Sequence, residues 1–438
     1  MTSNFENQKN GNNQPQVGLI PDYWQAIRGF SPTLWRFLLS NMASGTAIFG
    51  IVAVLQNLFL LRLGFDARFI GLLTAVGRMA FAAGALPVSL LSNRIGLRNG
   101  IALGFGLVGF GQALTLLVEG QPEAVWRTWL MGSQGMLFFG VAFVAVNVPP
   151  YLMAVTSERE RRYAFAAFQS VIPAAAFLGS LLAGLLPGLF ADWLGLTLEQ
   201  TTPYRLALWV GPVLSFLSIL PLLGADPAKV TVRSQQQTIA ESVPGKWLLF
   251  FGLFVFLQSI GEGVVRVFFN VYLDTALAVP TAQIGMVMGM AQLLPIGAAL
   301  SAPLIIARFG TGYAMAAATL GFSLCLLPLA AGPQVGVAAL AFMGAISMST
   351  AASTARDLFG QEMVTPRWRT TSQSVAIIGL ATGFGVAGVV GGYLIETIGF
   401  EVVFFTGAAA ALFSAGLLVA VLRWHAQGVV PKVDSEVS

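Results

Sequence analysis

The sequence has few of the side chains from which catalytic, redox and metal sites are built. Among 438 residues there is one cysteine, Cys325, and one histidine, His425. A single cysteine excludes an intrachain disulfide, and no set of histidines and cysteines has the spacing of a metal site. The sequence also lacks a phosphate-binding glycine loop and a Ser/His/Asp set. We therefore expect a protein that is not an enzyme and that needs no metal or cofactor.

Charged residues are scarce as well. They make up 10% of the chain, whereas soluble domains carry ~25%. Hydrophobic residues make up 56%, and the mean hydropathy is +0.77. A chain of this composition needs lipid around most of its surface, so we expect a multi-pass protein of the cell (inner) membrane. The net charge of +4 comes from scattered basic residues rather than a patch, which argues against nucleic acid as a partner.

Twelve apolar stretches are each long enough to cross a bilayer as a helix, which takes ~20 residues. Their approximate bounds are 37–61, 69–91, 100–118, 129–154, 164–190, 205–224, 247–272, 283–307, 312–331, 335–356, 373–395 and 401–423. Lipid offers backbone groups no hydrogen-bond partner, and these runs are too long and uniformly apolar for barrel strands. The predicted fold class is therefore an all-α membrane protein with twelve transmembrane helices.

The basic residues predict which side of the membrane each connection occupies. With both termini and alternate connections on one face, seventeen of the 23 lysines and arginines lie there and four lie on the other face. Arg78 and Arg266 remain at membrane depth. Because positive residues favour the cytoplasm, both termini are predicted to be cytoplasmic. The predicted domains are an N-terminal tail (1–32), a six-helix half (33–224), a cytoplasmic linker (225–246), a second six-helix half (247–424) and a C-terminal tail (425–438).

The second half repeats the first. An offset of 214 residues aligns 70–96 with 284–310 without a gap, and an offset of 204 aligns 158–188 with 362–392. Polar landmarks such as Glu158 stay in register, which chance alignment of apolar helices does not require. The glycines and alanines that recur in these stretches permit close helix packing in a membrane. The repeat predicts two pseudo-symmetric halves.

The connection after the second span resembles the signature loop of the major facilitator superfamily, Asp-Arg-x-Gly-Arg-Arg/Lys. Arg94, Gly96 and Arg98 match it, and Asn93 replaces the acidic residue. Together with the repeat, the resemblance implies the major facilitator fold, with a solute site between the halves near the midplane. A positively charged turn that only follows topology is the alternative interpretation. The family's antiporter and sugar-porter motifs are not matched, so no subfamily is identified.

In the family this loop takes part in a cytoplasmic charge latch that favours the outward-open state. The latch candidates that the resemblance and the repeat imply here are Asn93, Arg94, Gly96, Arg98, Glu158, Arg308, Gly310 and Glu362. The loss of the acidic residue at Asn93 predicts a weaker latch.

Polar residues of the seventh span are predicted to share one helix face. Gln258, Glu262, Arg266 and Asn270 recur every fourth residue, and Glu262 and Arg266 can pair at the i to i+4 spacing. Ionisable residues at bilayer depth are costly and by default face a cavity or a partner. In one interpretation the pair separates as the halves move, so that Glu262 takes up a proton. In the other it is a permanent ion pair that holds the helix to its neighbours.

Arg78, in the middle of the second span, is predicted either to contact a solute carboxylate or phosphate or to anchor helix carbonyls. The further candidates for a substrate cavity are Gln258, Asn270, Gln56, Asn57, Asn147 and Gln292. For Gln56, Asn57 and Asn147 a contact between helices is an equal alternative. If Arg78 and Arg266 both face the cavity, an anionic, zwitterionic or amphiphilic solute is favoured.

The sequence predicts a secondary active transporter of a small organic solute that works as a monomer by alternating access, with protons as an optional coupling partner. The alternative is a transport-inactive sensor or scaffold that retains the fold, which fold alone does not exclude. The charge pair of the seventh span favours transport, because a scaffold has little reason to keep charged groups at membrane depth.

Overall fold

The computed structural model describes residues 28–225, 245–332, 334–364 and 368–426, and these form helices joined by short connections. The first half comprises α2 (Pro32–Gly45), the π-helix η1 (Thr46–Val52), α3 (Ala53–Arg62), α4 (Ala67–Ile95), α5 (Leu97–Leu116), α6 (Trp126–Val155), α7 (Glu158–Leu194), α8 (Thr201–Leu208), α9 (Val210–Leu217) and α10 (Ile219–Leu223). The second half comprises α11 (Gly245–Thr275), α12 (Thr281–Phe309), α13 (Thr311–Ala331), α14 (Val335–Glu362), α15 (Arg369–Thr397) and α16 (Phe400–Ala426).

The observed helices follow the order of the twelve predicted spans. Eleven of them, among the described residues, are long and apolar enough to cross a membrane, and α12 is a further helix of 29 residues. The first span is continuous through α2, η1 and α3, and the sixth is divided into α8, α9 and α10. The all-α prediction is confirmed. Most of the predicted linker and of the two tails lies outside the described residues.

Local sequence explains where several helices begin. Asp66 caps α4 by accepting the backbone N–H of Phe69 at 2.9 Å. Ser157 and Glu160 form a capping box at the start of α7, in which each side chain accepts the other residue's backbone N–H. These polar caps satisfy N–H groups that have no partner in the first helical turn.

Two glycine turns give direct structural support to the internal repeat. Gly96, between α4 and α5, has φ 86° and ψ 155°, and Gly310, between α12 and α13, has φ 81° and ψ 158°. Glycine adopts positive φ without the steric cost that a β-carbon imposes. Residues 214 positions apart in the sequence therefore make the same turn in both halves, and the prediction of two pseudo-symmetric halves is confirmed.

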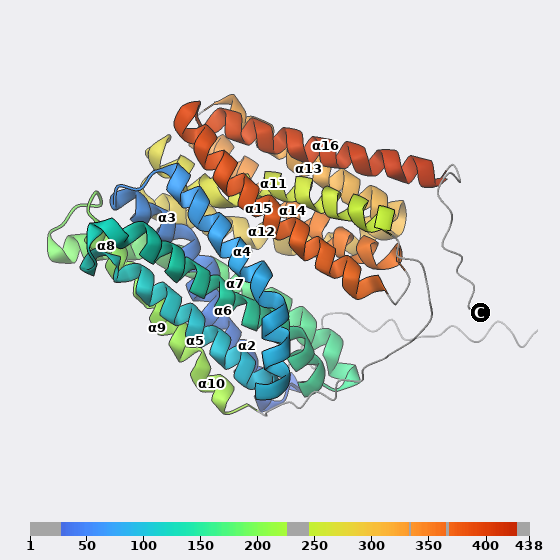
Figure 1. Cartoon of the computed structure of the whole chain (residues 1–438), viewed down its shortest axis with the longest axis horizontal. Coiled ribbons are helices and arrows are strands. Elements are labelled where there is room, and N and C mark those ends of the chain that lie inside the picture. The colour runs from blue at the N-terminus through green and yellow to red at the C-terminus, as the bar shows by residue number, and fades with distance from the viewer. Residues whose placement is uncertain (1–27, 226–244, 333, 365–367, 427–438) are drawn as a thin grey trace, which may run out of the picture.

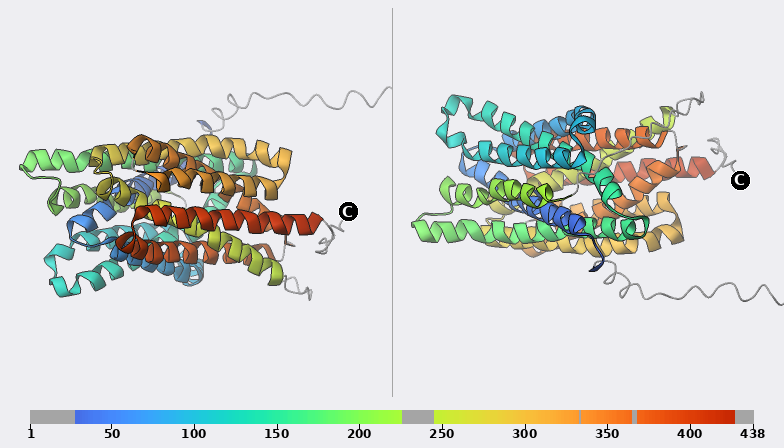
Figure 2. Two further views of the ribbon diagram at one scale, coloured as in Figure 1. Left: turned by 90° about the horizontal axis from the view of Figure 1, so that it is seen from above. Right: turned by 90° about the horizontal axis from the view of Figure 1, so that it is seen from below.

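The two halves lie side by side, and their helices run along a common long axis (Figures 1 and 2). In Figure 1 the halves meet where α3 ends and α4 begins, and they spread apart toward the ends of α10 and α16. We call the first of these the closed end and the second the diverging end. The pairs α4 with α15 and α7 with α12 make the main contacts between the halves.

Small residues allow these helices to approach closely at the closed end. A β-carbon on Gly71 of α4 would overlap the carbonyl of Gly388 in α15, and one on Gly285 of α12 would overlap the backbone of Gly184 in α7. Without a hydrophobic driving force between helices in lipid, such close packing supplies much of their attraction. The glycine pairs thus bring the halves together at this end.

Gly71→Leu is expected to weaken closure by about 1–3 kcal/mol, the usual cost of overpacking. An ideal β-carbon on Gly385 would lie 3.8 Å from the β-carbon of Ala75, a separation suited to a disulfide. In a Cys325→Ser background, the pair Ala75→Cys and Gly385→Cys is expected to cross-link efficiently, and Gly71→Leu to lower the yield. Gly132→Leu is the control, because nothing lies within 4 Å of that position. Equal yields in both variants would contradict this account of closure.

Candidate functional site: charged side chains between the halves

The polar stripe of α11 lies at the centre of the candidate site. Arg266 Nε donates to Glu262 Oε1 at 2.7 Å, one helical turn apart. The Glu262 side chain is 14% exposed and the Arg266 side chain 34%. Ser349 of α14 lies beside the Glu262 carboxylate. The carboxylate is therefore bonded within α11 and faces α14, and its cationic partner is the more exposed member of the pair.

A second arginine approaches this pair from α14. Arg356 is 6% exposed, lies within electrostatic range of Glu262, and donates from Nη1 to Gln258 Oε1 at 3.1 Å. The Gln258 amide in turn donates to Thr319 of α13 at 3.1 Å. Gln258 thus joins three helices of the second half and places Arg356 beside the polar stripe.

Arg78 of α4 brings a charge from the first half. Its guanidinium carbon lies 4.1 Å from the ring centroid of Phe384 in α15 and 5.5 Å from that of Phe138 in α6. The side chain interacts electrostatically with both Glu262 and Arg266. Arg78 of the first half therefore lies within electrostatic range of the α11 pair of the second half.

Other predicted cavity residues lie in contacts between helices. Asn147 is fully buried and donates to Ser92 Oγ and to the carbonyl of Phe143, both at 2.8 Å. Gln56 donates to Gln134 at 2.7 Å inside the first half. For these two residues the structure favours the alternative of a helix contact. Gln292 of α12 is half-buried.

Asn57 and Asn270 join the two halves directly. Asn57 of α3 donates to the carbonyl of Val267 at 2.8 Å and to Asn270 Oδ1 at 3.1 Å. Asn270 donates to the carbonyls of Ala53 and Val54. These two predicted cavity residues lie in contact between α3 and α11, on the closed-end side of the charge pair.

An ion pair that the sequence analysis did not identify completes the closed end. Arg62, the last residue of α3, makes a bidentate contact with Asp274 of α11, with N–O distances of 2.5 and 2.8 Å. The same guanidinium donates to Tyr204 Oη and to the Leu198 carbonyl, and Tyr204 bonds Thr281 of α12 at 2.9 Å. The sequence shows an arginine and an aspartate at the ends of two predicted spans. It does not show that these two residues, 212 positions apart, contact each other.

The predicted latch residues lie at the diverging end. Arg98 donates to the carbonyls of Leu223 and Ala225 at the end of α10, within its own half. Arg94, Arg308 and Glu362 are exposed. The side chains of Asn93 and Glu158 are outside what the structure describes.

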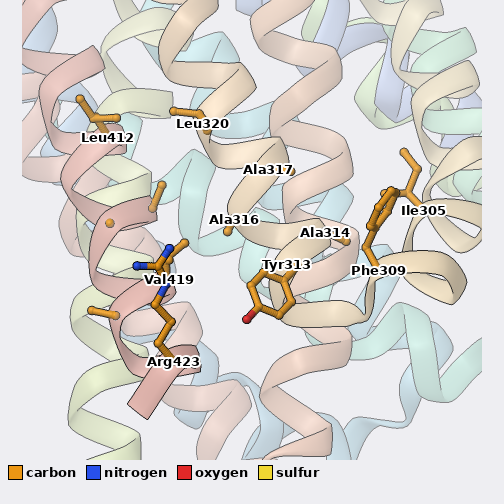
Figure 3. A pocket seen from close by; sticks show the side chains of 13 residues that line it. Ile305, Phe309, Tyr313, Ala314, Ala316, Ala317, Leu320, Leu412, Val419 and Arg423 are labelled. Carbon is orange, nitrogen blue, oxygen red and sulfur yellow. The ribbon is translucent and has the colours of Figure 1, made fainter. Parts of the chain in front are cut away.

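A large pocket lies away from these charges. It has a volume of about 840 Å³ and is formed by α12, α13 and α16, with mainly apolar side chains and with Tyr313 and Arg423 toward one end (Figure 3). A smaller pocket of about 230 Å³ lies among α2, η1, α5, α6 and α7, next to Asn41 and Ser44. Among the described residues there is no group of three or more His, Cys, Asp or Glu side chains placed to hold a metal.

Several solved transporter structures resemble this fold. One is a point variant of the nucleoside transporter NupG, with a TM-score of 0.71 and 16% identity over 89% of this chain and 99% of that chain. Another is the inward-open xylose transporter XylE from E. coli, with a TM-score of 0.68 and 14% identity over 92% of this chain and 97% of that chain. A third is a bacterial homologue of the human lysosomal transporter Spinster in an inward-facing and occupied conformation, with a TM-score of 0.66 and 16% identity over 92% of this chain and 98% of that chain. No curated protein matches the chain.

Two pseudo-symmetric helical halves around charged side chains at membrane depth define the class: a multi-pass membrane protein with a transporter fold. The sequence model of the Major Facilitator Superfamily matches residues 37–365, and the chain belongs to this superfamily.

Proposed function

We propose that this protein is a secondary active transporter that moves a small organic solute across the cell membrane by alternating access. The observation that carries the proposal is the arrangement of the halves, which are bonded at one end through Arg62 and Asp274 and diverge at the other. Between these ends lie Arg78 and the pair of Glu262 and Arg266. Charged groups at membrane depth mark solute or ion pathways in membrane proteins.

The asymmetry of basic residues orients the molecule. The predicted cytoplasmic connections join helices at the diverging end, so the closed end faces outward and the structure is inward-facing. In a Cys325→Ser background, a thiol introduced by Ser435→Cys is expected to be labelled by a membrane-impermeant reagent only after cell lysis. One introduced by Glu123→Cys, which is exposed between α5 and α6, is expected to be labelled in intact cells. The reverse pattern would contradict the orientation.

Proton coupling is proposed for Glu262. In the inward-facing arrangement Arg266 holds its carboxylate, with Ser349 beside it. Movement of the halves that separates Arg266 from Glu262 leaves a desolvated carboxylate, which favours the protonated form. With His425 as the only histidine, this carboxylate is the strongest candidate to carry a proton through the membrane.

Solute flux in proteoliposomes tests the proposed function. Purified protein is reconstituted and offered a panel of labelled carboxylates, phosphate esters, nucleosides, sugars and amines, with and without a pH gradient. Uptake of at least one solute above that of protein-free liposomes is expected. Absence of flux for the whole panel would favour the sensor or scaffold.

A further inference from the structure

The charges between the halves do not balance. Arg78, Arg266 and Arg356 lie near one well-buried carboxylate, Glu262, which is already paired with Arg266. Among the residues that the structure describes, the other acid in contact with these arginines is Asp357, whose side chain is 58% exposed and whose Oδ1 lies 3.7 Å from Arg356 Nε. Taking a charge out of water is costly unless an opposite charge compensates it. The site therefore carries an excess of positive charge.

Arg78 has unused hydrogen-bonding capacity. Its Nε is buried and has no hydrogen-bond partner among the described residues, and no hydrogen bond to a helix carbonyl is found for the guanidinium. An anchoring arginine donates to carbonyls, so the anchor interpretation of Arg78 loses its main support. A buried donor without a partner is destabilising, and a ligand that accepts from it removes that cost.

The aromatic rings fix the position of the Arg78 guanidinium. Phe384 lies 4.1 Å and Phe138 lies 5.5 Å from its central carbon, on helices α15 and α6. These ring contacts are electrostatic and accept no conventional hydrogen bond from the guanidinium, so its N–H donors stay available to a ligand. An arginine presented in this way suits two parallel hydrogen bonds to a carboxylate or phosphate, a geometry that lysine does not reproduce.

Arg356, in the second half, is another arginine whose hydrogen-bond donors are only partly used. It is 6% exposed, and its Nη1 donates to Gln258, but its Nε is buried without a hydrogen-bond partner. Arg78 belongs to the first half and Arg356 to the second. Both halves thus contribute an under-compensated cation to the same region around Glu262.

We propose that the solute is an organic anion whose carboxylate or phosphate accepts hydrogen bonds from Arg78, with Arg356 adding positive charge from the other half. The inference rests on the proposed function, because it names the substrate class of that same site. A cationic solute would meet a net positive site in which Glu262 is already bonded to Arg266. Phe138 and Phe384 act as positioning residues, since they hold the Arg78 guanidinium in its orientation.

The test combines binding and flux. Thermal shifts of purified protein are measured with the labelled panel described above, and each anion is paired with its neutral amide or alcohol. At least one carboxylate or phosphate ester is expected to stabilise the protein, and its neutral counterpart to have little effect. Arg78→Gln is expected to weaken anion binding by about 10- to 100-fold, as for the loss of a hydrogen bond to a charged group.

Two variants control for folding and for charge. Arg127→Gln removes another arginine that lies over an aromatic ring, 5.7 Å from the Phe69 centroid and exposed near the closed end, and is expected to leave binding unchanged. Arg78→Lys keeps the charge without the planar donors and is expected to restore part of the affinity.

The outcomes separate the two proposals. Anion binding that depends on Arg78, with no flux of any solute, keeps the anion site and contradicts transport. Flux of neutral or cationic solutes alone keeps transport and overturns the anion site. Anion binding that is equal in wild type and Arg78→Gln also overturns it, as does a panel in which no anion binds.

Discussion

Glu262→Gln is expected to reduce solute accumulation driven by a pH gradient to the level of protein-free liposomes, while exchange of solute without a gradient continues. Glutamine has nearly the same shape as glutamate and can accept the hydrogen bond from Arg266, but it cannot carry a proton. The variant therefore separates proton coupling from the movement of the halves. Accumulation and exchange are measured on the same proteoliposome preparation.

Glu123→Gln is the matched control, because this carboxylate is exposed in a connection between helices and its loss leaves the membrane-depth charges intact. Its pH-driven accumulation is expected to equal that of wild type. If Glu262→Gln shows the pH dependence of wild type, Glu262 is not the proton carrier and the pair with Arg266 is structural.

Arg62→Asp is expected to destabilise the arrangement in which the closed end is shut by about 3–5 kcal/mol, the usual effect of breaking a buried ion pair. Asp274 is 8% exposed on its side chain, and the substitution places a second carboxylate beside it. The conformational equilibrium should shift away from the state closed at this end, and the rate of transport should fall. The double variant Arg62→Asp/Asp274→Arg is expected to restore part of both, since it restores opposite charges across the halves.

The pair of Arg205 and Glu119 provides the control for that experiment. Its N–O distance is also 2.5 Å, but both residues belong to the first half. Arg205→Asp is expected to leave the balance between the two conformations unchanged, because Arg205 and Glu119 belong to the same half and move together. An equal shift in both single variants would show that general destabilisation, rather than separation of the halves, is being measured.

Much of the fold was predictable from the sequence because a bilayer restricts the choice so strongly. Apolar length sets the number of helices, and lipid requires the backbone to satisfy its own hydrogen bonds. Bounds were less predictable: the first helix continues to Arg62, past the predicted end at 61, and begins at Pro32. The π-helix η1 and the division of the sixth span into α8, α9 and α10 were not predicted, and neither was the close approach of Gly50 in η1 to Gly179 in α7, because hydropathy reports the length of a span and not its contacts.

The candidate site was predictable where it depends on one helix. The four-residue spacing on α11 places Glu262 next to Arg266, and the structure has them at 2.7 Å. Contacts between segments far apart in the sequence were not predictable in this way. Examples are the contact of Arg62 with Asp274 and that of Arg78 with Phe384. A polar residue in a membrane helix faces a cavity or a neighbouring helix, and helix period does not distinguish the two for Asn147.

Distances between spin labels on the two halves test alternating access most directly. In a Cys325→Ser background, one pair reports the closed end, Trp193→Cys with Gln283→Cys, and another the diverging end, Met153→Cys with Leu358→Cys; all four positions are exposed. The account predicts two populations at each end, with Arg62→Asp lengthening distances at the closed end and shortening them at the diverging end. A single population at both ends, unchanged by Arg62→Asp, would contradict it.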